Sequence, residues 1–272
     1  MDGRWLPQQN VPAALRGVAH KLDRAERHLD EIAATTERTL QGFKVAVTPR
    51  PRQGNRVPYR LQDAPTLPPA LSVMFGDALH NMRSALDHLA WQLVLRDGGQ
   101  PTQQTQFPLQ LHPRSDGGFP EIRGGVAAAT RQLLDEVQPY ADDDLGADPR
   151  LHPLAVLKTL SNIDKHRELL LGVAVVSGGS WSCDVGVAAS FERGPHRSVR
   201  NGDDLGVLVV DPADAEIHDL ELDFALRLVE GSEAGFYARF DLVDWALHHA
   251  MTAVEYRVLR RFLPLFTESA GP

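Results

Sequence analysis

Apolar residues recur every three to four positions in four parts of the chain, the spacing that places them on one face of an α-helix. These parts are residues 11–43, 69–97, 125–163 and 239–266. The third part divides into two shorter helices, because an acidic link at 141–149 interrupts it. Gly98 and Gly99 follow the second part directly and are expected to end its helix. The pattern therefore predicts a helical bundle.

Between residues 169 and 229 the pattern changes to that of β-strands. Leu169 to Val176 is a continuous apolar run, and strands are also expected at 181–191, 205–210 and 216–229. Earlier in the chain, two short segments at 43–47 and 56–61 flank a turn rich in Pro, Gly and Asn. The expected fold class is α+β: a helical bundle with an inserted antiparallel β-sheet at about 169–229 and a basic β-hairpin. We expect residues 1–272 to form a single domain.

Composition and charge narrow the class of protein. The net charge is −8, so the whole molecule does not attract nucleic acid, although a local basic groove remains open. The predicted hairpin carries such a run of basic residues: Lys44, Arg50, Arg52, Arg56 and Arg60. The single Cys183 allows no intramolecular disulfide. No segment reaches the roughly 18 apolar residues of a membrane span or forms an apolar signal core, so the expectation is a cytoplasmic protein without a membrane partner.

The helix expected at 69–97 has an unusual polar face. Its apolar stripe consists of Leu79, Met82, Ala85, Leu86, Leu89 and Leu93. The opposite side gathers Asp77, His80, Asn81, Ser84, Asp87, His88 and Trp91, with Arg83 at its edge. A solvated helix face usually carries Glu, Lys and Gln, whereas imidazole, carboxylate and guanidinium groups together are typical of sites. This helix is therefore the first place to look for function.

Arg83-Ser-Ala-Leu-Asp-His88 resembles the Arg-x(4–6)-His motif of the HEPN superfamily, and the resemblance covers only residues about 69–97. HEPN proteins are small helical bundles that include many metal-independent ribonucleases. The resemblance implies an RNA substrate, no cofactor and a homodimer. In such a dimer, Arg83 and His88 would pair with the same residues of a second subunit to form a composite RNA-cleaving site.

The side-chain chemistry of the pair is compatible with this function. An imidazole can move the proton of a 2′-hydroxyl group, and a guanidinium can hold a phosphate through two parallel hydrogen bonds. His80 or Asp87 would orient the catalytic groups. The expected substrate-binding residues are Asn81 and Ser84 on the same helix, together with Lys165, His166 and Arg167. The last three also suit a helix C-terminus, where basic side chains face the negative end of the helix dipole.

Two alternatives use the same residues differently. In the first, a divalent metal ion is held by ligands drawn from Asp77, His80, Asp87, Asp164 and His166, and the protein is a metal-dependent bundle enzyme acting on a small molecule. In the second, the polar residues form a buried network that joins helices, with Arg83 and Asp87 as an i, i+4 ion pair. The protein would then be a non-catalytic binding or assembly protein.

Overall fold

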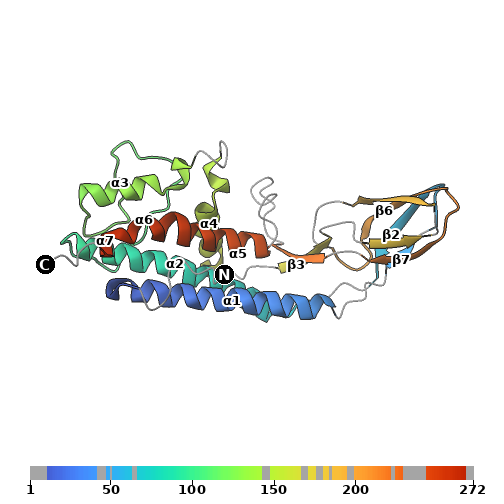
Figure 1. The fold of residues 1–272 in the computed structure, drawn as a ribbon, viewed down its shortest axis with the longest axis horizontal. Coiled ribbons are helices and arrows are strands. Elements are labelled where there is room, and N and C mark those ends of the chain that lie inside the picture. The colour runs from blue at the N-terminus through green and yellow to red at the C-terminus, as the bar shows by residue number, and fades with distance from the viewer. Residues whose placement is uncertain are drawn as a thin grey trace.

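The structure is a computed structural model of the chain. It describes residues 11–41, 47–49, 51–62, 66–142, 148–166, 171–175, 180–183, 186–194, 199–221, 224–228 and 243–267. The α+β fold class predicted from the sequence is confirmed. Helices gather at one end of an elongated molecule, and strands β2, β6 and β7 lie at the other (Figure 1).

Long helices occur where the apolar periodicity predicts them. The α-helices are α1 (Arg16–Gln41), α2 (Ala70–Arg96), α3 (Ala128–Glu136), α4 (Pro153–His166), α5 (Val243–Thr252), α6 (Arg260–Phe262) and α7 (Pro264–Thr267). Short 3-10 turns occur at Ala13–Leu15 (η2), Pro139–Ala141 (η3) and Pro149–Leu151 (η5), and the segment Ala253–Leu259 (η6) is a π-helix. The final predicted helix is therefore a series of consecutive helical segments, and its predicted residues 239–242 lie outside the described residues.

α2 ends as its sequence predicts. The last helical residue is Arg96, and Gly98 has a φ of +79°, a conformation that glycine adopts without strain. The N–H of Gly99 donates a hydrogen bond to the carbonyl oxygen of Val94 (2.9 Å), so a backbone group at the helix end is satisfied. The chain then runs from Asp97 to Ala127 without a described helix or strand.

The helices share one hydrophobic core. Every member of the apolar stripe predicted for α2 is buried, and α1 packs along α2 over most of its length (Figure 1). The loop after α2 contributes Phe107, which is fully buried and meets Phe262 edge-on with ring centroids 6.2 Å apart. The loop is therefore fixed to the bundle by its own apolar side chain.

The strands in the described part of the chain form three antiparallel sheets. They are β1 (Val47–Pro49), β2 (Arg56–Leu61), β3 (Leu171–Val175), β4 (Ser180–Cys183), β5 (Ala188–Arg193), β6 (Asp204–Asp211), β7 (Ile217–Glu221) and β8 (Phe224–Leu228). A four-stranded sheet has the order β1-β2-β6-β5, while β3 pairs with β8 and β4 pairs with β7. The predicted hairpin is present as β1 and β2, although β1 begins at the last residue of the predicted 43–47 strand and residues 43–46 lie outside the described residues.

Two strand predictions are wrong in their extent. The segment 181–191 contains β4 and β5 in different sheets, with a turn between them at Gly186 (φ +91°). The segment 216–229 contains β7 and β8, which also pair in different sheets. The four-stranded sheet has a small hydrophobic cluster of its own, formed by Val57, Tyr59, Leu208 and Val210 and separate from the core of the bundle.

Candidate functional site

The polar face of α2 is largely a surface of the molecule. Asp77, His80, His88 and Trp91 are exposed, and Ser84 is half-buried. Only Asn81 is buried, and its side-chain amide donates a hydrogen bond to the backbone oxygen of Asp77 one turn earlier (2.8 Å). The hypothesis of a buried network is therefore wrong for the two histidines and Asp77, which solvent reaches.

Arg83 and Asp87 do form the i, i+4 pair expected from their spacing. Their closest atoms, Nη2 and Oδ1, lie 3.0 Å apart, and the Arg83 side chain is 12% exposed. Arg83 Nη2 also donates to the carbonyl oxygen of Phe107 (2.8 Å), while the N–H of Phe107 donates to Asp87 Oδ1 (2.9 Å). The pair thus holds both backbone groups of Phe107, and among the described residues Arg83 Nη1 has no hydrogen-bond partner.

The environment of Asp87 makes its carboxyl group easier to protonate. Burial raises its pKa and outweighs the opposing effects of Arg83, the Phe107 N–H, Lys165 and His88. The charge of Lys165, in the last turn of α4, is thus one of the weaker influences on this carboxyl group of α2.

Asp87, His88, Trp91 and Gln92 form one wall of a groove of about 390 Å³, and the loop residues Thr102, Gln103 and Thr105 form the other. We call it the α2 groove. Trp91 is 39% exposed, so much of its indole ring is open to solvent. The groove combines a carboxyl, an imidazole and an aromatic ring on one side with amide and hydroxyl groups on the other.

The loop wall of the α2 groove is held by local hydrogen bonds. The backbone N–H of Thr102 donates to Thr105 Oγ1 (2.9 Å), and this hydroxyl donates to the carbonyl oxygen of Arg123 (2.6 Å). On the opposite side, His88 lies against Gly17 of α1: a Cβ atom at residue 17 would stand 2.7 Å from His88 Nδ1. The sequence analysis missed this wall, and a polar Thr-Gln-Gln-Thr segment was the only signal that could have indicated it.

A second set of charged groups lies toward the start of α2. Asp164 of α4 packs directly on Gly76, where a Cβ atom would stand 2.3 Å from Asp164 Oδ1. Burial, and then the charge of Asp77, raises the pKa of Asp164, while His80 lowers it. Three of the alternative metal ligands are therefore neighbours. Yet no group of three or more His, Cys, Asp or Glu side chains among the described residues could hold a metal ion.

The three substrate-binding residues predicted near the end of α4 do not form one site among the described residues. Lys165 and His166 occupy the last turn of α4 and are exposed, as expected for basic residues at a helix C-terminus. His166 lines a different groove, together with Lys158 and Asn162. Arg167 lies outside the described residues.

The basic hairpin lies at the far end of the molecule from the helices α3 and α7 (Figure 1). Within the sheet, Arg56 forms an ion pair with Glu192, and Arg60 lies 3.3 Å from Asp204 (Nε to Oδ1). Arg52 donates a hydrogen bond to the backbone oxygen of Ala215. These three arginines thus have partners in the sheet or in the segments that connect its strands, which weakens the basic patch that the sequence suggests; Lys44 and Arg50 lie outside the described residues.

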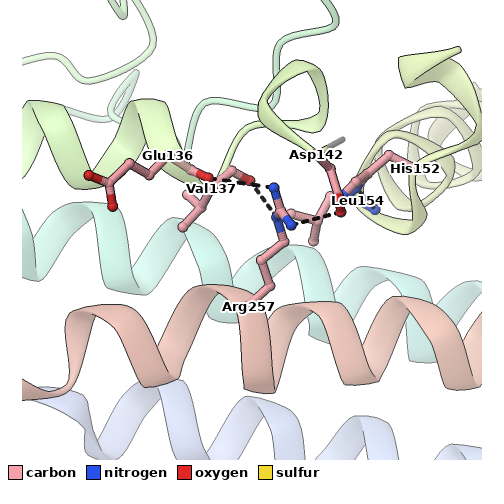
Figure 2. A network of polar contacts seen from close by, with 6 residues as sticks. All are labelled: Glu136, Val137, Asp142, His152, Leu154 and Arg257. Carbon is pink, nitrogen blue, oxygen red and sulfur yellow. Dashed lines mark hydrogen bonds and ion pairs between the residues drawn. The ribbon is translucent and has the colours of Figure 1, made fainter. Parts of the chain in front are cut away.

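A partly buried polar network that the sequence pattern did not indicate joins three segments of the bundle (Figure 2). Arg257 Nη1 lies 2.7 Å from Asp142 Oδ2, and the same carboxylate oxygen lies 3.2 Å from His152 Nε2. The other ring nitrogen, Nδ1 of His152, accepts a hydrogen bond from the N–H of Leu154 at the start of α4 (3.0 Å). Burial, followed by the charge of Arg257, lowers the pKa of His152 to about 4. The neutral imidazole thus supports the beginning of α4.

A carboxyl group on the π-helix has the opposite perturbation. Burial of Glu255, followed by the charges of Glu26 and Asp23 on α1, raises its pKa to about 7. The three acids come from helices that lie together in the bundle (Figure 1). Repulsion between them therefore depends on pH near neutrality.

Comparison of the chain with family models, with curated protein sequences and with solved structures finds no match. Among the described residues, none of the helices combines the length and the apolar character needed to cross a lipid bilayer. The functional interpretation consequently depends on the α2 groove and its chemistry.

Proposed function

We propose that this protein binds RNA in the α2 groove and cleaves it, with His88 as the general acid or base. The observation that carries the proposal is the exposed imidazole of His88 beside the half-exposed indole of Trp91 in one groove of about 390 Å³. A volume of this size suits a small ligand portion such as one nucleotide. A nucleobase can stack on an exposed aromatic ring, as bases of single-stranded RNA commonly do.

The other groups of the groove have roles that fit this substrate. The amides of Gln92 and Gln103 can donate and accept hydrogen bonds at the edges of a base. Asp87 lines the same groove as His88, and its carboxyl group can accept or donate a hydrogen bond at the ligand. Arg83 acts as a positioning residue, because its Nη2 atom holds Asp87 and the Phe107 carbonyl group.

The proposed reaction is an internal transesterification. His88 removes the proton from a 2′-hydroxyl group, the 2′ oxygen attacks the adjacent phosphorus, and the bond from phosphorus to the 5′ oxygen breaks. The leaving oxygen takes a proton from an imidazolium, which a second copy of the chain would supply through its own His88. The products are a 2′,3′-cyclic phosphate and a 5′-hydroxyl end, and the reaction consumes no other reactant.

The test is cleavage of an end-labelled single-stranded RNA by the full chain in the presence of a chelator. General acid–base catalysis contributes at least about 100-fold, so His88→Ala is expected to lower the cleavage rate by that factor. His249→Ala is a matched control, because His249 is exposed on α5 and lies outside the α2 groove. Equal cleavage by wild type and His88→Ala would overturn the proposal, as would the absence of RNA binding and cleavage by the wild type.

A non-catalytic binding or assembly protein is the second candidate. The observation that favours it is the use of the Arg83–Asp87 pair to hold the Phe107 backbone, a role that needs no ligand. This candidate predicts that Arg83→Met lowers stability by about 3 kcal/mol, because it leaves the partly buried Asp87 without its partner. It also predicts no RNA turnover by any variant.

A further inference from the structure

A second groove lies on α4, and its polar residues form a row. Lys158, Asn162 and His166 follow one another at four-residue intervals, which places them on one face of the helix about one turn apart. Together with Leu111, Thr159 and Ile163 they line a groove of about 430 Å³. We call it the α4 groove. Its lining combines apolar side chains with the side chains of this polar row.

The charge of the α4 groove differs from that of the whole protein. The net charge of the chain is −8, yet none of the described residues that line this groove is acidic. Lys158 Nζ donates a hydrogen bond to the carbonyl oxygen of Leu109 (2.7 Å), so the ammonium group is held in a fixed position although Lys158 is exposed. A cation, an amide and an imidazole, with no carboxylate among the described residues that line the groove, favour an anionic ligand.

The two grooves are connected by one segment of the loop. The backbone of Phe107 is hydrogen-bonded to Arg83 and Asp87 of α2. Two residues later, the backbone oxygen of Leu109 accepts a hydrogen bond from Lys158 of α4. Leu111 then lines the α4 groove, whereas Thr105 lines the α2 groove. The segment 105–111 therefore runs from one groove to the other.

We infer that the α4 groove holds the phosphodiester backbone of the RNA next to the nucleotide in the α2 groove. The inference rests on the proposed function and adds that the substrate is a single strand of several nucleotides. A groove with positive groups that follows the backbone, beside an aromatic platform for a base, is the usual arrangement for binding single strands.

The experiment compares two labelled oligouridines by fluorescence anisotropy. One has about 3 nucleotides, fewer than common single-strand site sizes, and the other has about 12, which lies within their range. The test variant is Asn162→Asp, which adds a carboxylate to the α4 groove without changing side-chain size. The matched control is Asn55→Asp, because Asn55 is exposed on the hairpin at the other end of the molecule. Inorganic tripolyphosphate, measured by calorimetry, is a second probe that needs no base.

Asn162→Asp is expected to weaken binding of the longer RNA by about fivefold and to leave the shorter RNA unaffected, the effect of one like charge at close range in a surface groove. Asn55→Asp should change neither. Unchanged binding of the longer RNA by Asn162→Asp, with His88→Ala still inactive in cleavage, would overturn the inference and leave the proposed function standing. If the wild type binds no RNA, the proposed function fails. In that case, tripolyphosphate binding that is weakened by Asn162→Asp would still support an anion site in the α4 groove. If the wild type bound no tripolyphosphate, the anion site would be refuted as well.

Discussion

Acidification is expected to destabilise this protein through one buried imidazole. His152 is 1% exposed and stands just before the first residue of α4. Its Nδ1 atom accepts the N–H of Leu154, so the ring must be unprotonated at that nitrogen and donates through Nε2 to Asp142 (3.2 Å). A second proton on the ring would remove this helix cap and place a cation beside Arg257 and the positive end of the α4 dipole.

The size of the effect follows from the pKa of His152, which is lowered from 6.5 to about 4. Each tenfold change in proton affinity corresponds to about 1.4 kcal/mol, so this difference is worth about 3 kcal/mol. Between pH 4 and 6.5 the unfolded chain binds more protons at this residue than the folded one, and stability therefore rises with pH. The contribution is fully present above pH 6.5 and is lost as the pH falls toward 4.

The measurement is the free energy of unfolding in urea at several pH values between 7 and 4, with the slope m checked at each pH. His152→Asn is the informative variant, because asparagine can still accept the Leu154 N–H but does not titrate. The difference in unfolding free energy between wild type and this variant is expected to shrink by about 3 kcal/mol from pH 7 to pH 4. His166→Asn is the control, since His166 is exposed at the other end of α4.

Parallel pH profiles of the wild type and His152→Asn would refute this reasoning. So would a wild type that gains stability relative to the variant as the pH falls, because the sign of the linkage would then be opposite. A pH response of His166→Asn that differs strongly from that of the wild type would show that exposed histidines dominate the acid transition.

Three further predictions concern other parts of the bundle. Because burial and like charges on α1 raise the pKa of Glu255 to about 7, the contribution of this carboxyl group to stability should fall as the pH rises from about 4.5 to 7, opposite in sign to the contribution of His152. Glu255→Gln should therefore raise the Tm above pH 7 by the equivalent of about 1–2 kcal/mol after solvent screening, and an unchanged Tm would contradict this. Phe107→Ala should lower the unfolding free energy by about 3–5 kcal/mol in urea, because it removes a fully buried ring, and a loss below about 1 kcal/mol would show that the loop is not part of the core. Gly17→Ala should displace the His88 ring and reduce RNA cleavage, because the added Cβ atom would stand too close to the imidazole. The stability of α1 should be kept or increased, since alanine favours the helix over glycine. Undiminished cleavage would show that activity does not depend on the position of the His88 ring.

Local sequence patterns were sufficient to predict the long helices and the C-terminal end of α2, which depends on the backbone conformation of glycine. The apolar stripe of α2 is buried as predicted, and Gly98 ends the helix because its positive φ favours glycine. The Arg83–Asp87 pair could also be predicted, since residues four apart on a helix are neighbours. The residue that the pair binds could not be predicted, because Phe107 lies 20 residues beyond Asp87 in a loop without periodicity.

The sequence by itself determined the helical bundle, the presence of antiparallel strands and the polar face of α2, because the spacing of apolar residues fixes which side of an element is buried. Only the tertiary structure decided which strands pair. The hairpin β1–β2 joins β6, more than 140 residues later, and adjacent strands such as β7 and β8 enter different sheets. It also decided that Thr102 and Thr105 face His88 across a groove, and that Asp142, His152 and Arg257 meet inside the bundle. Such contacts depend on how the chain packs over long separations, and no local period encodes them.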